Sequence, residues 1–435
     1  MDDPEVLERM RADWNHRAGE DANYYVAFGR RAQDDEEFFS TATDVVRLLT
    51  GELKRLRGRS AALEIGCGPG RLMRPLSRHF AEVHGVDVSD EMIRLAAERL
   101  RGTPNAHPHH SSGSDLALFR DETFDFVYSY AVFQHIPSRD VVLNYLREAR
   151  RVLKTGGILR CQINGLPAHA KQYDTWSGVR IAPDEVRQFA REQDFQLLAL
   201  EQIWTQYMWV TCRKMPPGWS EWLARKSGPS GTGAGSGQAR IRTVSNALTG
   251  EMAAPAAGPL AFVSAWVEDL PEDCDLNHLS MTAEGRPCRL SYIGAPDPVT
   301  QVNAALPEGL RTGLVPIELM WLGRPICAPG WMRIIPAGPS VPRIGALTDG
   351  VNLLSDNRIT SGILKVTMTE VAHPRELRVT VDGGDAVVSD SFCVDPVAER
   401  WEFNIDVPAS AGPGPHEVRI AIGKRTFPPM VIEVE

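Results

Sequence analysis

Long apolar runs are missing from this 435-residue sequence: none approaches the roughly 20 residues that a membrane-spanning helix needs. The first residues, MDDPEVLERMRADW, are acidic and polar, whereas a secretion signal is basic and then apolar. We therefore expect a cytoplasmic protein with no membrane span.

Cysteine is scarce, and none of the seven cysteines forms a CxxC pair. This spacing argues against a paired-cysteine zinc site and against a disulfide framework. His107, His109 and His110 lie close together on an expected strand, but alternation along the strand separates the first two from the third. We therefore expect no metal site.

An excess of basic residues is also missing: 47 Lys+Arg stand against 56 Asp+Glu, a net charge of −9. Nucleic acid is accordingly a poor candidate partner. A hydrophobic fraction of 43% with 24% charged residues is typical of globular proteins and excludes wholesale disorder. At about 150 residues per domain, the length suits two or three domains.

The composition changes in the middle of the chain. Residues 226–238, KSGPSGTGAGSGQ, are rich in glycine and serine and predict a flexible linker. Beyond them, strand-like runs are separated by proline and glycine, and residues 279–285 match residues 377–383 at an offset of 98. The pattern predicts two tandem β-sandwich domains. We expect domain boundaries at 1–215, 216–258 (linker), 259–338 and 339–435.

The N-terminal half alternates between strand-like and helix-like segments. Expected strands are 61–65, 82–87, 124–130 and 157–164, and expected helices are 69–79, 89–101, 138–153 and 183–193. Residues 195–204 and 205–214 are expected to close the sheet as an antiparallel pair. This order predicts an α/β fold with a doubly wound parallel sheet, whose ligand crevice lies at the carboxyl ends of the strands.

A glycine-rich turn follows the first expected strand. Gly66, Gly68 and Gly70 let the backbone turn sharply, and the helix start beyond them offers free N–H groups to an anion. Asp87 ends the next strand, where its carboxylate can accept both hydroxyl protons of a ribose. Dinucleotide-binding folds share this logic, but the spacing here is GxGxG and not GxGxxG.

Four motifs occur in order: EIGCGPG, GVDVSDEMI, FDFVYSYAVFQHI and LKTGGIL. Over residues 45–214 the sequence resembles the class I S-adenosylmethionine (SAM)-dependent methyltransferases of the bacterial small-molecule type. The resemblance implies a Rossmann-like seven-stranded sheet, SAM as cofactor and S-adenosylhomocysteine (SAH) as product. The later β segments resemble bacterial immunoglobulin-like modules of the IPT/TIG sort. Such modules imply contacts with protein or carbohydrate, or a role in oligomerisation.

The same resemblance implies roles along the cofactor. Gly66, Cys67, Gly68 and Gly70 would lie against the methionine portion and the ribose, in a loop ordered by Glu64, and Asp87 would bind the ribose hydroxyls. Val88 and Met92 would pack on the adenine, whose edge would meet Ser114, Asp115 and Leu116. Ser129 and Tyr130 would face the amino group and the methyl centre.

Other residues are candidates on the acceptor side. His135 could accept a proton from a hydroxyl, cap the following helix or bond a backbone carbonyl. Gln134 could point at substrate or at solvent, and Tyr130 is expected near the reacting methyl group. A helical lid is expected from Trp14, Arg17, Tyr24 and Tyr25, with ordinary packing as the alternative, and Arg17 could contact the SAM carboxylate. Tyr173, Trp176, Tyr207 and Trp209 could form substrate walls or pack in the core.

These features predict an enzyme that transfers a methyl group in line to a small-molecule or glycan-linked acceptor, at oxygen. Two alternatives stay open: a scaffold whose β modules bind a partner while the methyltransferase fold is vestigial, and an NAD-dependent oxidoreductase. We also expect residues 1–225 to fold alone and bind SAM. Residues 259–435 are expected to fold separately and to supply no catalytic group.

Overall fold

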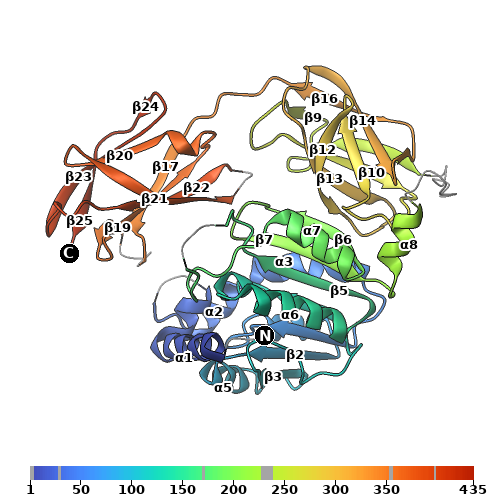
Figure 1. The fold of residues 1–435 in the computed structure, drawn as a ribbon, viewed down its shortest axis with the longest axis horizontal. Coiled ribbons are helices and arrows are strands. Elements are labelled where there is room, and N and C mark those ends of the chain that lie inside the picture. Colours follow the sequence, from blue (N-terminus) through green and yellow to red (C-terminus); the bar gives the residue numbers. More distant parts are fainter. Residues whose placement is uncertain (1–3, 28–30, 169–171, 227–238, 352–355, 396–397) are drawn as a thin grey trace. The chain divides into compact units, whose positions relative to one another are not determined.

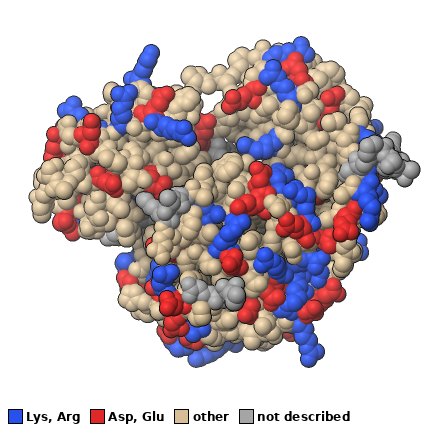
Figure 2. All heavy atoms as spheres, in the orientation of Figure 1, with Lys and Arg blue, Asp and Glu red and all other residues tan. Residues whose placement is uncertain are grey.

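The computed structural model describes residues 4–27, 31–168, 172–226, 239–351, 356–395 and 398–435. The expected Gly/Ser-rich linker therefore lies outside the described residues, apart from Lys226. Two compact units are present: residues 1–253 with 262–333, and residues 254–261 with 334–435. Within the described residues, no helix is both long and apolar enough to cross a membrane. Basic and acidic side chains are interspersed over the face seen in Figure 2.

The N-terminal half of the first unit is built on a seven-stranded stretch of sheet. Its strands are β1 (Ala61–Ile65), β2 (Glu82–Asp87), β3 (Ala106–His110), β4 (Phe124–Ser129), β5 (Leu153–Ile163), β6 (Phe195–Glu201) and β7 (Met208–Lys214). They are ordered β3-β2-β1-β4-β5-β7-β6. Strands β1 to β5 pair in parallel, and β7 runs antiparallel to both of its neighbours. The expected parallel sheet with a closing antiparallel pair is confirmed.

Helices connect these strands. They are α1 (Pro4–Ala27), α2 (Asp35–Ser40), α3 (Thr43–Gly51), η1 (Glu52–Arg55), α4 (Met73–Leu76), α5 (Asp90–Arg99), η2 (Phe133–His135), α6 (Arg139–Val152), α7 (Pro183–Glu192) and α8 (Trp219–Lys226). Ser89 caps α5 by accepting a hydrogen bond from the backbone N–H of Met92. The helix expected at 69–79 was too long, because residues 68–72 form a turn in which Gly68 and Gly70 have positive φ angles.

The core of this half lies between the sheet and its helices. Leu49 of α3, Met73 of α4 and Ala96 of α5 are fully buried in one cluster with Phe126 and Tyr128 of β4. Helices α6 and α7 lie over the sheet face turned toward the viewer in Figure 1. In open α/β sheets of this kind, ligands bind in the crevice at the carboxyl ends of the strands.

The rest of the described chain is almost entirely β. In the first unit it contains β8 (Arg240–Ser245), β10 (Phe262–Glu268), β11 (Leu279–Ala283), β12 (Arg286–Ile293), β13 (Thr300–Ala305), β14 (Gly313–Trp321), β15 (Arg324–Pro325) and most of β16 (Gly330–Ile335); β9 (Ala253–Pro255) straddles the boundary. The second unit contains β17 (Arg343–Asp349), β18 (Arg358–Ile359), β19 (Ile363–Thr369), η3 (Pro374–Glu376), β20 (Leu377–Val381), β21 (Gly384–Asp395), β22 (Arg400–Asp406), β23 (Gly414–Ile422), β24 (Arg425–Thr426) and β25 (Met430–Val434). Helix α8 and strands β8 and β9 fall in the range expected as linker.

The two β regions repeat one pairing pattern. In the first, β8 pairs with β10, β10 with β13, β13 with β12, β12 with β11 and β11 with β14. In the second, β17 pairs with β19, β19 with β22, β22 with β21, β21 with β20 and β20 with β23. Strands β11 and β20 begin at Leu279 and Leu377, the offset of 98 seen in the sequence. The internal repeat is therefore structural.

The first β region adjoins the edge strand β6. Tyr292 of β12 pairs with Ala199, and the backbone N–H of Leu276 donates to the carbonyl of Leu197 at 2.9 Å. The Arg187 guanidinium donates to the carbonyl of Leu276 at 2.7 Å. These contacts cover backbone groups that an edge strand would otherwise expose. The compact unit therefore joins residues that we had assigned to two domains, and the expected boundaries stay predictions.

Candidate functional site

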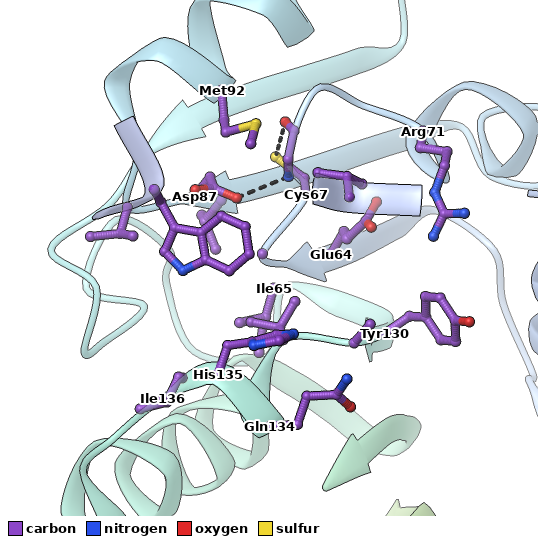
Figure 3. A pocket seen from close by; sticks show the side chains of 18 of the residues that line it. Glu64, Ile65, Cys67, Arg71, Asp87, Met92, Tyr130, Gln134, His135 and Ile136 are labelled. Carbon is purple, nitrogen blue, oxygen red and sulfur yellow. Dashed lines mark hydrogen bonds between the residues drawn. The ribbon is translucent and has the colours of Figure 1, made fainter. Parts of the chain in front are cut away.

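A cavity of about 280 Å³ lies where β1, β2 and β4 end (Figure 3). Ten of the residues expected from the sequence line it: Glu64, Gly66, Cys67, Gly68, Asp87, Val88, Met92, Tyr130, Gln134 and His135. They come from β1 and β2, from the segments that follow β1, β2 and β4, and from helices α5 and η2. These segments lie close together because β2, β1 and β4 are neighbours in the sheet and run parallel.

The glycine turn is tightly constrained. Gly66, Gly68 and Gly70 have φ angles of +73°, +50° and +85°, which L-residues with side chains rarely adopt. A Cβ at Gly66 would lie 2.3 Å from Cγ2 of Val132. The backbone N–H groups of Gly66 and Cys67 both donate to the carbonyl of Val86, at 2.8 and 3.0 Å. The turn is thus held against β2, and Gly66 and Gly68 place no side chain at the cavity.

Asp87 connects the glycine turn to α5. Its Oδ2 accepts from the backbone N–H of Gly68 and its Oδ1 from that of Ser89, each at 2.9 Å. Burial raises the pKa of Asp87, while these two amides oppose the rise. Each oxygen keeps a further lone pair, so the carboxylate can still accept hydrogen bonds from a pair of vicinal hydroxyls.

Glu64 lies behind the turn, fully buried. Burial raises its pKa to about 8, although a hydrogen bond from the Tyr128 hydroxyl at 3.0 Å opposes the rise. Glu64 was expected to order the glycine turn, and the hydrogen bond that the described residues give its side chain comes from Tyr128 of β4. A carboxyl group with this pKa is mostly protonated at neutral pH.

The expected adenine side is only partly assembled. Val88 and Met92 line the cavity together with Gly113 and with Met10 and Trp14 of α1. Ser114, Asp115 and Leu116 are not among the described residues that line it. The Leu116 N–H donates to Glu148 at 3.2 Å, and Asp115 accepts from the N–H of Ala117 at 3.0 Å, so these residues shape the loop.

The opposite side of the cavity carries Tyr130, Gln134 and His135. The Tyr130 ring stacks on Trp209 at 5.9 Å between centroids, and Gln134 has a buried Oε1 with no described partner. Ser129 faces away: its hydroxyl donates to the carbonyl of Ile65 at 2.9 Å. Ser129 therefore ties β4 to β1 and does not line the cavity.

His135 is held in one orientation. Its Nδ1 lies 3.2 Å from the carbonyl of Thr175, and its ring meets Trp14 edge-on at 5.6 Å. Because a carbonyl only accepts, Nδ1 carries the proton and Nε2 is left as an acceptor. Burial lowers the pKa of His135 to about 4. The imidazole is therefore neutral at pH 7.

Arg17 lies elsewhere than expected. Its guanidinium donates to the carbonyl and the hydroxyl of Thr175 at 3.2 and 3.0 Å and lies over the rings of Trp14 and Trp176. Arg17 does not line the cavity. Its guanidinium is already bonded to Thr175, because α1 packs on that segment. Arg17 therefore fastens α1 and is not presented to a ligand.

Helix α1 does cover the cavity, as a lid would. Met10, Trp14, Tyr25, Val26 and Ala27 line it, whereas Tyr24 is buried in the protein. Tyr207 also lines the cavity, but Tyr173, Trp176 and Trp209 do not.

Two further groups of expected residues lie away from the cavity. Gly70 is not among the lining residues and lies against the side chain of Leu100. Among the histidines of the sheet edge, His107 contacts Glu82, and His109 lies 3.0 Å from His84.

Several lining residues escaped sequence reasoning. Arg71, which directly follows Gly70, is the most notable of them, and Val132 and Ile136 follow β4. A cation immediately after a glycine turn was a readable signal. The apolar residues gave none, because only the fold decides which of them face the cavity.

Comparisons with known proteins concern this same part of the chain. Residues 63–161 match the family model of a methyltransferase domain. Phosphoethanolamine N-methyltransferase 2 of Caenorhabditis elegans is 35% identical over 97 residues, which is 22% of this chain and 22% of that protein. Trans-aconitate 2-methyltransferase of Agrobacterium fabrum is 31% identical over 121 residues, 26% of this chain and 44% of that protein.

The chain thus spans less than half the length of these two curated relatives. A solved structure of DhpI in complex with SAH is 20% identical, with a TM-score of 0.37, and covers 48% of this chain and 98% of that one. The matched segment, residues 63–161, contains the glycine turn, Asp87 and His135. This segment is similar to a methyltransferase domain.

Proposed function

We propose that this protein is a SAM-dependent methyltransferase that methylates an oxygen of a small-molecule or glycan-linked acceptor. One observation carries the proposal. A single cavity contains a glycine-rich turn, a buried carboxylate with spare lone pairs and a neutral histidine. When bound there, SAM supplies an electrophilic methyl group on a sulfonium centre.

The residues on the cofactor side fit SAM. Asp87 would accept hydrogen bonds from the ribose hydroxyls, while Val88 and Met92 would pack on the adenine. The lack of side chains at Gly66 and Gly68 lets the backbone approach the ligand closely. With α1 over the cavity, Trp14 and Tyr25 would exclude water from the reacting groups.

The acceptor side would work mainly by positioning. Tyr130 and Gln134 would orient the acceptor so that its oxygen lies in line with the methyl group, and alignment alone lowers the barrier substantially. His135 presents its unprotonated Nε2 as the acceptor for a hydroxyl proton. Its fixed Nδ1–H···O=C contact holds the imidazole in the tautomer this role requires.

Asp87→Ala should weaken SAH binding at least tenfold, because the ribose would lose a charged hydrogen-bond partner worth about 1.5–3 kcal/mol. Isothermal titration calorimetry checks this. Asp90→Ala is the matched control, since the Asp90 side chain is 64% exposed and does not line the cavity. Equal affinities of Asp87→Ala and wild type would refute the site. A melting temperature raised by NAD⁺ and not by SAH would refute the cofactor.

His135→Gln should lower turnover about 10²–10⁴-fold at saturating SAM, the range lost with a general base, and leave SAH affinity within a few-fold. The assay is SAH release with acceptors from a panel of phenols, alcohols and carboxylic acids. His373→Gln, at an exposed position of the second unit, is the control. A parallel loss of SAH affinity would place His135 on the cofactor side instead.

The β regions belong to the proposal as recognition modules. Their repeated strand order supports two immunoglobulin-like β-sandwich domains, expected at 259–338 and 339–435. Their proposed role is to bind protein or carbohydrate, or to mediate oligomerisation, without supplying a catalytic group. We also propose that the protein is located in the cytoplasm.

A further inference from the structure

Arg71 is a buried cation that lacks an ionic partner. Arg71 is only 6% exposed, yet it lines the cavity. Nη1 donates to the Thr41 hydroxyl at 3.1 Å, and the guanidinium lies 5.5 Å from the centre of the Tyr130 ring. Nε has no hydrogen-bond partner. Within the described part of the chain, no carboxylate forms an ion pair with Arg71.

The nearest acidic group does not neutralise this charge. Glu64 is close enough for its charge to influence Arg71, but burial raises the pKa of Glu64 to about 8, so the carboxyl is mostly protonated at pH 7. Arg71 keeps its own proton, because arginine stays charged in proteins even when burial lowers its pKa. A positive charge therefore remains at this wall of the cavity.

The position of Arg71 is informative as well. Figure 3 shows Arg71 and Tyr130 at the side of the cavity away from Asp87 and Met92. A ligand that places its ribose at Asp87 would extend toward Arg71. Burying a cation without a counter-ion is expensive, and a planar guanidinium matches a carboxylate in geometry and charge.

We propose that Arg71 binds a carboxylate in this cavity. The proposal rests on the methyltransferase function and deepens it. Two sources share this chemistry: the amino-acid carboxylate of the cofactor, or a carboxylate on the acceptor. In the first case Arg71 orients the methyl donor, and in the second it selects acidic acceptors.

Arg71→Met separates these sources in the full-length protein. SAH and 5′-methylthioadenosine, which lacks the amino-acid portion, are titrated by calorimetry into wild type and variant. Citrate is titrated into both proteins with and without SAH, as a carboxylate probe. Arg74→Met is the matched control, because Arg74 is exposed, lies three residues along and stacks on Phe39 at 4.7 Å.

If Arg71 holds the cofactor carboxylate, Arg71→Met weakens SAH at least tenfold and leaves 5′-methylthioadenosine within twofold. If it holds an acceptor carboxylate, SAH affinity is kept while citrate binding falls at least tenfold. Arg71→Lys, which retains the charge without the planar fork, should recover part of the loss and guards against a folding defect.

Arg71→Met affinities within twofold of wild type for both SAH and citrate overturn the proposal. A loss that is equal for SAH and 5′-methylthioadenosine also overturns it, because the effect then does not depend on the carboxylate. If the wild-type protein binds citrate but not SAH, the methyltransferase function is refuted. The citrate titration of Arg71→Met then tests the role of Arg71 by itself.

Discussion

Gly66→Ala is expected to reduce SAH affinity at least a hundredfold while the protein still folds. The added Cβ would meet Cγ2 and Cγ1 of Val132 at 2.3 and 2.6 Å, and the φ angle of +73° is unfavourable for alanine. The turn cannot move away easily, because the Gly66 N–H is bonded to the Val86 carbonyl. Val132 also lines the cavity, so relief of the clash distorts the cofactor side.

Calorimetry with SAH measures the loss, and circular dichroism confirms the fold. Gly156→Ala is the matched control: its φ is +86°, but nothing lies within 4 Å of the added Cβ, so it tests backbone strain without a clash. Gly66→Ala combined with Val132→Ala should recover part of the affinity. Unchanged SAH affinity in Gly66→Ala would show that the turn is not the cofactor site.

Arg55→Met is expected to lower the free energy of unfolding by about 3–5 kcal/mol, the cost of breaking a buried ion pair by removing one partner. Arg55 pairs with Glu52, and their side chains are only 1% and 5% exposed. Its guanidinium also donates to the carbonyl of Ile293 at 2.6 Å, in the first β region. Removing Arg55 therefore leaves Glu52 with its longer ion pair to Arg160, at 3.6 Å, and loosens the contact between that region and the sheet.

Urea unfolding followed by fluorescence measures this change. Arg47→Met is the control: Arg47 pairs with Asp44, but both side chains are more than 70% exposed, so the expected loss is below about 1 kcal/mol. Adding Glu52→Gln to Arg55→Met should restore part of the stability, because the buried carboxylate that lost one of its two cations disappears, while Arg160 keeps its pair with Glu201. A loss below about 1 kcal/mol for Arg55→Met would show that this buried pair does not hold the unit together.

Local patterns were enough to predict the N-terminal sheet and half of the site. Strands of apolar residues and the glycines of the turn report on their own backbone, so each can be predicted from neighbours in the chain. Asp87 follows from the same logic, since it ends a strand beside the turn. The repeated β regions were readable because equivalent residues recur at a nearly constant spacing.

Tertiary structure alone decided the remaining features. Arg17 and Arg71 are both cations near the expected site. Their neighbours in the chain do not show that Arg17 donates its hydrogen bonds to Thr175, or that the described residues give Arg71 no ion pair. The contact between Tyr292 and Ala199 joins residues far apart in sequence. The sequence by itself thus determined the strands of the N-terminal sheet, the glycine turn and the order of the motifs. The distribution of charge among partners came from packing, because burial and pairing depend on residues distant in the chain.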